Sequence, residues 1–342
     1  MRFRLPLLFI VLMAAALLAK PFEAAALITP TGTAANTSTN ATFAPASIWD
    51  NVGVAGDSTG EYLGNGWIIT ANHVSRSGNN INFSLTLGVT TYNWLGTGTR
   101  LGSHDIFLAQ LSPDGSGNLP DAYGATGVPL ATSTPSTTTS TIMIGGGRTI
   151  SATTYYTVSG NTWTQDTNGN SSTPNEDPVY SWGPSRLKTW GTNNIWGTTA
   201  AGSFGTLGGD NALAVDFSAS GNYSPSTPYR DVATSSETGA ALNDSGGGMF
   251  VQEGGNWKLA GLLVGIDNWL GQPTTTSDGT PSPLPPNGVG QYTTTVGDDT
   301  YAIDLSSYAS QINEVIATPE PSSIACLALG LAVLGARRNR KR

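Results

Sequence analysis

The sequence predicts an all-β protein built as two small antiparallel barrels. Glycine (43 residues) and proline (20 residues) are abundant, and threonine and serine are common throughout, which is typical of chains with many turns. Short apolar runs bounded by turn residues form two clusters, and a Ser/Thr/Pro-rich stretch over residues 131–141 separates them. The sequence has no repeat of fixed period, and only residues 306–316 have the pattern of an amphipathic helix.

Residues 1–26 have the three parts of a secretory signal peptide. Two arginines precede an apolar run over residues 5–19, and three alanines close the segment at residues 24–26. Lys20 and Glu23 leave this run short of the roughly 20 apolar residues that span a bilayer. We therefore expect export and removal of this segment rather than a membrane-spanning helix.

The rest of the chain divides by composition. Residues 27–45 are rich in Thr, Ala and Asn without periodicity, which predicts a flexible leader. An N-terminal barrel is expected over 46–135 and a C-terminal barrel over 136–317, with a polar surface insertion at 161–177. The apolar runs predict strands at 52–54, 66–70, 81–87, 91–95 and 106–111, then at 142–147, 212–217, 248–252, 257–265 and 301–305.

The insertion also contains oxygen-bearing side chains at the spacing of a calcium loop. Carboxylates and amides at residues 166–170 are followed by Glu176 and Asp177. Ser171 stands where such a loop needs glycine, however, and Asp177 stands where it needs glutamate. We expect a solvated polar loop without a metal or other cofactor, and calcium binding at 166–177 is the alternative.

The C-terminal segment, residues 318–342, carries a second processing signal. Residues 318–321 read Thr-Pro-Glu-Pro, an apolar stretch follows at 322–336, and five of the six residues at 337–342 are basic. This pattern resembles the PEP-CTERM sorting signal of Gram-negative bacteria. The resemblance implies processing by an exosortase and a location outside the cell or at its envelope. Residues 322–336 would anchor the chain in a membrane, transiently or permanently.

The exported domain is acidic and lacks cysteine. Eight of the 15 Lys and Arg residues lie in the two end segments, leaving seven basic residues against 21 acidic ones. A net charge near −14 argues against nucleic-acid binding. The single cysteine, Cys326, lies in the C-terminal segment, so the domain has no disulfides and must rely on its core.

Three segments carry residue types that acyl transfer requires, in the order His73, Asp105, Ser245. The histidine follows an apolar strand, the aspartate precedes one, and the serine lies in a glycine-rich turn. A serine hydroxyl becomes nucleophilic when an imidazole accepts its proton, and a carboxylate orients that imidazole. Glycines allow backbone N–H groups to converge on the oxyanion.

These segments resemble the motifs of trypsin-like serine proteases. Residues 70–74 (Thr-Ala-Asn-His-Val) are similar to the histidine motif, 105–109 (Asp-Ile-Phe-Leu-Ala) to the aspartate strand, and 243–247 (Asn-Asp-Ser-Gly-Gly) to the serine motif. The resemblance implies two six-stranded Greek-key barrels with the active site in the cleft between them. It also implies that His73 is the base, Asp105 its orienting partner and Ser245 the nucleophile. The N–H groups of Asn243 and Ser245 would form the oxyanion hole.

The chain departs from the family pattern in four places. Asn243 replaces a glycine, and asparagine is the least costly substitute if that residue needs a positive φ. No Arg/Lys-Ile-Val-Gly-Gly activation site is present, so Asp244 needs a partner other than a freed N-terminus. The usual disulfides are absent, and the strand at 259–266 lacks the Ser-Trp-Gly triplet that binds substrate.

The residues that resemble the specificity pocket are small and uncharged. Gly239 stands where trypsin has an aspartate, and Val264 and Gly265 lie on the strand that follows the nucleophile. A small or apolar side chain before the scissile bond is expected, although Glu237 leaves a basic one open.

The sequence thus predicts a secreted serine endopeptidase with a protein or peptide substrate. The first alternative is an inactive surface protein of the same fold that binds peptide or glycan. An esterase acting on non-peptide acyl groups, and a matrix protein with a Thr-rich surface, also remain open.

Overall fold

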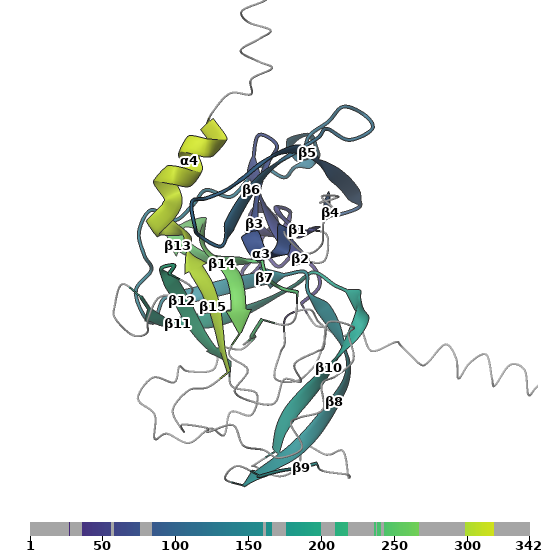
Figure 1. The fold of residues 1–342 in the computed structure, drawn as a ribbon, viewed down its shortest axis with the longest axis vertical. Coiled ribbons are helices and arrows are strands. Elements are labelled where there is room, and N and C mark those ends of the chain that lie inside the picture. The colour runs from purple at the N-terminus through teal and green to yellow at the C-terminus, as the bar shows by residue number, and fades with distance from the viewer. Residues whose placement is uncertain are drawn as a thin grey trace, which may run out of the picture.

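The computed structural model describes residues 27, 36–55, 58–75, 84–159, 162–165, 176–199, 209–217, 236, 238–240, 243–266 and 298–317. Two closed six-stranded antiparallel barrels and a separate three-stranded sheet make up the described chain (Figure 1). The prediction of an all-β fold with two six-stranded barrels is confirmed.

The first barrel has the strand order β1-β2-β3-β6-β5-β4. Its strands are β1 (Val52–Ala55), β2 (Ser58–Gly64), β3 (Trp67–Ala71), β4 (Ser84–Leu87), β5 (Thr90–Arg100) and β6 (Ile106–Leu111). The short helix α2 (Ala46–Trp49) precedes the barrel, α3 (Asn72–Ser75) follows β3, and the 3-10 helix η1 (Pro120–Tyr123) follows β6. Strand β2 was not among the predicted strands, because its sequence is mostly polar although six of its seven residues are buried.

The second barrel has the order β11-β12-β15-β14-β13-β7. Its strands are β7 (Ser140–Gly145), β11 (Thr189–Thr198), β12 (Ala212–Phe217), β13 (Gly248–Glu253), β14 (Asn256–Ile266) and β15 (Asp298–Asp304). The 3-10 helix η2 (Leu305–Tyr308) and helix α4 (Ala309–Ala317) follow, as predicted from the apolar pattern. The Asp304 side chain accepts the N–H of Ser306 at 3.1 Å and caps this turn.

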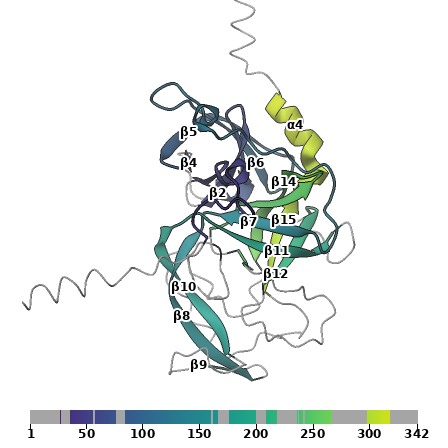
Figure 2. The same ribbon diagram turned by 180° about the vertical axis from the view of Figure 1, so that it is seen from behind.

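A third sheet stands apart from the barrels. It contains β8 (Arg148–Ser159), β9 (Thr162–Gln165) and β10 (Glu176–Arg186) in the order β10-β8-β9. Both ribbon views show β8 and β10 reaching away from the two barrels as a long arm (Figure 2). The alternative calcium loop falls largely outside the described residues, and its last two candidates, Glu176 and Asp177, begin β10.

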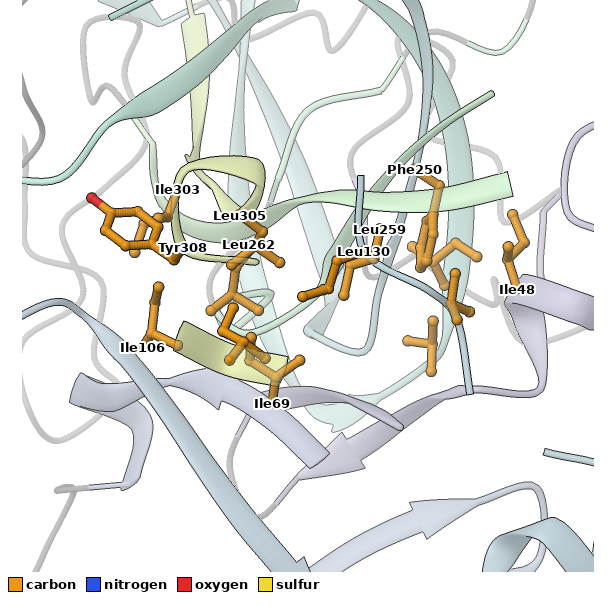
Figure 3. Packing of buried hydrophobic residues seen from close by; sticks show 14 of the residues in the cluster. Ile48, Ile69, Ile106, Leu130, Phe250, Leu259, Leu262, Ile303, Leu305 and Tyr308 are labelled. Carbon is orange, nitrogen blue, oxygen red and sulfur yellow. The ribbon is translucent and has the colours of Figure 1, made fainter. Parts of the chain in front are cut away.

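Apolar side chains fill three clusters, and the largest lies between the barrels. Ile68 of β3 and Ala109 of β6 point into the first barrel, whereas their neighbours Ile69 and Leu108 pack against the second barrel. Figure 3 shows Ile69 and Ile106 facing Leu262, Ile303 and Leu305 across this shared cluster. The alternation of strand side chains thus gives these strands two buried faces and joins the barrels through a common core.

The described residues of the predicted leader pack against the second barrel. Leu27 is fully buried, and its N–H donates to Thr189 Oγ1 at 2.7 Å. Phe43 stacks on Trp190 with ring centroids 5.6 Å apart, and the backbone N–H of Trp190 donates to Asn36 O at 3.0 Å. Leu27 and Phe43 thus contact the second barrel, although they lie in a segment whose Thr- and Asn-rich composition predicts flexibility.

In the described part of the chain, no helix is long and apolar enough to cross a membrane. The predicted anchor at 322–336 and the signal peptide at 1–26 lie outside the described residues.

Candidate active site

His73 lies where a buried strand of the first barrel ends. All five residues of β3 are buried, and the chain then turns into α3, which begins at Asn72. The His73 side chain is 48% exposed. Strand β3 therefore fixes the backbone from within the barrel while the imidazole remains accessible from solvent.

Asp105 lies beside His73 because β3 and β6 pair antiparallel, with Ala71 opposite Ile106. Asp105 Oδ2 is 2.5 Å from His73 Nδ1, and Asp105 Oδ1 accepts the backbone N–H of His73 at 2.7 Å. The backbone N–H of Asn72 donates to Asp105 O at 3.0 Å. The carboxylate thus holds both the ring and the main chain of the histidine, which fixes its tautomer with Nδ1 protonated.

The turn that carries Ser245 docks on the first barrel. Thr59 N–H donates to Ser245 O at 3.1 Å, and the Ser58 hydroxyl donates to the same carbonyl. At Gly246, which has φ +83°, a Cβ would collide with Thr59 O and Thr70 Oγ1. Since Thr70 is three residues before His73, this close approach brings the serine turn to the end of β3.

The hydrogen bonds of the described residues do not include one between Ser245 Oγ and His73. In unliganded enzymes such bonds are often long and shorten in the substrate complex. Two of the three predicted catalytic side chains are therefore directly bonded, and the turn that carries the third contacts β2 and β3 of the same barrel through its backbone.

The backbone of the serine turn is tightly constrained. Asn243 has φ +75°, the left-handed conformation that asparagine tolerates best among residues with a side chain. Gly247 N–H donates to Asp244 O at 2.8 Å, and Gly246 N–H donates to Leu263 O on β14 at 2.7 Å. The turn is therefore anchored to both barrels.

Asp244 has a partner inside the second barrel. Its side chain is fully buried, and its Oδ1 accepts the N–H of Gly147 at 2.8 Å. Gly145 has no room for a side chain, because a Cβ there would collide with that carboxylate oxygen. Gly145, the last residue of β7, and Gly147, two residues later, thus accommodate the carboxylate that sequence reasoning left without a partner.

The three predicted pocket residues have different surroundings. Gly265 has open space where a side chain would project, whereas Val264 packs against the cluster between the barrels. Gly239 is buried, and the adjacent Ala240 N–H donates to Thr300 Oγ1 on β15 at 2.8 Å. None of these described residues is charged, and Glu237 lies outside the described residues.

Two ionisable side chains that no sequence motif marks are the half-buried Lys188, just before β11, and the buried Glu61 on β2. Lys188 Nζ donates to Trp49 O at 2.8 Å and Val52 O at 3.0 Å, and it lies 4.2 Å from the centroid of the Trp49 ring. Burial lowers the pKa of Lys188 to about 8. Burial raises the pKa of Glu61 on β2 well above its usual value, and the charge of Lys188 partly offsets this rise.

A second histidine–aspartate pair lies next to the first. His104 Nδ1 contacts Asp210 Oδ1, and Asp210 comes from the second barrel. No motif in the sequence marks Asp210. Within the described residues, no group of three or more His, Cys, Asp or Glu side chains is arranged to hold a metal ion.

Two closed antiparallel barrels of six strands, joined by a shared core and followed by a C-terminal helix, define the architecture. The chain has the chymotrypsin-like fold. Two solved structures of this fold are similar to it. An inactive serine-to-alanine mutant of Rv3671c from M. tuberculosis H37Rv is 11% identical, with 80% of this chain and 91% of that chain covered and a TM-score of 0.40. Neuropsin, a serine protease of mouse brain, is 16% identical, with 78% and 95% covered and a TM-score of 0.42.

Residues 317–341 match the model of the PEP-CTERM protein-sorting motif. This finding confirms the resemblance at the C-terminal end, and the motif marks proteins that are exported and processed at the cell envelope of Gram-negative bacteria. No curated protein matches the chain.

Proposed function

We propose that this chain is an exported serine endopeptidase that acts through an acyl-enzyme on Ser245. The observation that carries the proposal is the pair of hydrogen bonds between Asp105 and His73, with lengths of 2.5 Å and 2.7 Å. The serine turn docks on the same barrel. A carboxylate that holds both the ring and the backbone of an exposed histidine is the orienting element that a general base requires.

The proposed reaction begins with attack of Ser245 Oγ on the scissile carbonyl. His73 Nε2 accepts the hydroxyl proton, and Asp105 stabilises the imidazolium that forms. The N–H groups of Asn243 and Ser245 stabilise the oxyanion. His73 then gives its proton to the leaving amine. In the second half-reaction water attacks the acyl-enzyme, His73 accepts the proton of the water and returns it to Ser245 Oγ, and the carboxylic acid product leaves.

The preferred substrate carries a small, uncharged side chain before the scissile bond. Support comes from Gly239 and Gly265, and from the neutral neighbours Ala240 and Thr300. None of these four residues carries a charge that would attract a basic side chain.

The proposed protease acts at the cell envelope, where it encounters its peptide substrates after export. The PEP-CTERM motif supports processing by an exosortase-type enzyme. The apolar stretch at 322–336 would hold the chain in the membrane until that cleavage.

A fluorophosphonate probe tests the nucleophile directly. The full chain, purified in detergent, is expected to gain one adduct, which intact mass measures. Ser245→Ala should gain none, whereas Ser116→Ala, which changes a solvent-exposed turn on the first barrel, should be labelled like the parent. Equal labelling of the parent and Ser245→Ala would contradict the proposal.

The second candidate is an inactive protein of this fold that binds peptide or glycan, for which the exposed His73 beside the junction of the two barrels would line the binding surface. A folded parent that takes no label but retains a peptide or glycan ligand, equally in Ser245→Ala, would identify that function.

A further inference from the structure

The backbone of Asp105 is held from the opposite barrel. Its N–H donates to Asp210 Oδ2 at 3.0 Å, and Asp210 lies two residues before β12 of the second barrel. The contact crosses the boundary between the barrels. It joins the predicted orienting carboxylate to the barrel that carries Ser245.

Asp210 is itself firmly placed. It is 3% exposed, its Oδ1 contacts His104 Nδ1, and the Tyr308 hydroxyl lies 3.4 Å from the same oxygen. The His104 and Tyr308 rings pack with centroids 4.4 Å apart, and the Asn211 N–H donates to the Tyr308 hydroxyl at 3.1 Å. A buried carboxylate is tolerated only when donors satisfy it, and these groups supply them.

We infer that Asp210 is a positioning residue for the proposed protease, acting through the main chain of Asp105. The inference rests on the proposed function of His73, Asp105 and Ser245. Asp105 is fixed at four points. Its two carboxylate oxygens and its carbonyl bond the 72–73 segment of the first barrel, and only its N–H is bonded to the second barrel.

This arrangement has a definite consequence for catalysis. Without Asp210, the His73–Asp105 pair remains bonded internally but loses this link to the barrel that carries the nucleophile. Displacements of about 1 Å at a reacting centre cost on the order of 100-fold in rate. The loss therefore falls on kcat, because Asp210 touches neither the substrate nor the reacting atoms.

The chain contains only two histidines, so ring-nitrogen labelling of histidine reports on this site without interference. In the full chain, Nδ1 protons of His73 and His104 that donate to carboxylates give downfield resonances. His104→Phe keeps a ring against Tyr308, removes one of the two signals and so assigns them both. This readout does not depend on Ser245 or on any substrate.

Asp210→Ala is expected to lower kcat about 10- to 100-fold with KM within about twofold, and to shift the His73 Nδ1 proton. Asp210→Asn retains an acceptor for the Asp105 N–H and should recover a large part of that loss. Asp114→Ala is the matched control, since Asp114 is a hydrogen-bonded surface carboxylate just after β6, and it should change neither readout.

Parent values of kcat and of the His73 resonance in Asp210→Ala would overturn the inference. So would a loss of activity that follows only the folded fraction while the resonance stays unchanged. If Asp210→Ala does not fold, Asp210→Asn is the test, because its neutral amide accepts the Asp105 N–H more weakly than the carboxylate does. A lower kcat with a shifted His73 resonance would support the inference, and parent values of both would overturn it. If the parent shows the resonances but no Ser245-dependent labelling, the proposed function fails while the positional link is still tested.

Discussion

At the scale of single residues, two separate hydrogen bonds join His73 and Asp105. One carboxylate oxygen meets the ring nitrogen and the other meets the backbone N–H. An amide in place of the carboxylate keeps the shape but presents the wrong partner to Nδ1, which reverses the tautomer of the imidazole.

Asp105→Asn is therefore expected to lower the rate of fluorophosphonate labelling about 10⁴-fold at neutral pH, with the fold intact. Labelling rates by intact mass, with circular dichroism for the fold, measure this. Asp114→Asn serves as the control. A rate within a few-fold of the parent would show that Asp105 does not orient His73.

A second prediction at this scale concerns the left-handed backbone conformation of Asn243 in the serine turn. Asn243 has φ +75°, which glycine adopts freely and a β-branched residue does not. Asn243→Gly should label within about twofold of the parent, whereas Asn243→Val should lose about 1–2 kcal/mol of stability and label slowly. Equal behaviour of the two variants would mean that this φ is not required.

At the scale of elements, Lys188 connects the start of β11 to the first barrel through the carbonyls of Trp49 and Val52. Its pKa is lowered from 10.5 to about 8 by burial. Between these two values the unfolded chain binds more protons than the folded one, so the free energy of unfolding rises with pH.

From pH 8 to pH 9.5 we expect the free energy of unfolding to rise by about 1.5 kcal/mol, measured by urea denaturation. Lys188→Met should remove this slope. The window stops below pH 10 because burial raises the pKa of Tyr62, which lowers stability once tyrosines of the unfolded chain ionise. A flat or falling profile for the parent would contradict the prediction.

The observed strands also show which parts of the fold the sequence predicts and which it does not. Apolar runs predicted β6 and β12 at their observed bounds, because alternating strands need apolar residues on a buried face. Strand β2 has no such run. Tyr62 is buried in the core of its own barrel, whereas Ser58 and Thr59 are buried where β2 meets the serine turn of the other barrel. A sequence motif also identifies His73. Asp210 has no motif, because its contact with Asp105 exists only once the two barrels have packed together.

At the scale of the whole molecule, the barrels share one apolar cluster and should unfold together. Leu262 lies in that cluster and is fully buried. Leu262→Ala is expected to cost 2–5 kcal/mol and to shift a single transition. Val89→Ala, at a fully exposed position, should change stability by less than about 0.5 kcal/mol.

Tryptophan fluorescence and far-ultraviolet circular dichroism measure this, since Trp67 lies in the first barrel and Trp257 in the second. Coincident transitions by both probes are expected for one cooperative unit. Two separated transitions in the parent would mean that each barrel is stable alone.

The burial of Leu27 also bears on the timing of synthesis and export. Its partner Thr189 follows 162 residues later in the chain, and its side chain packs in the core of the second barrel. A ribosome or a translocation channel must therefore release more than half of the polypeptide before Leu27 reaches its place. Contacts of such long sequence separation form late, and the second barrel also needs β15, so it can be completed only after most of the chain has left the ribosome or the channel.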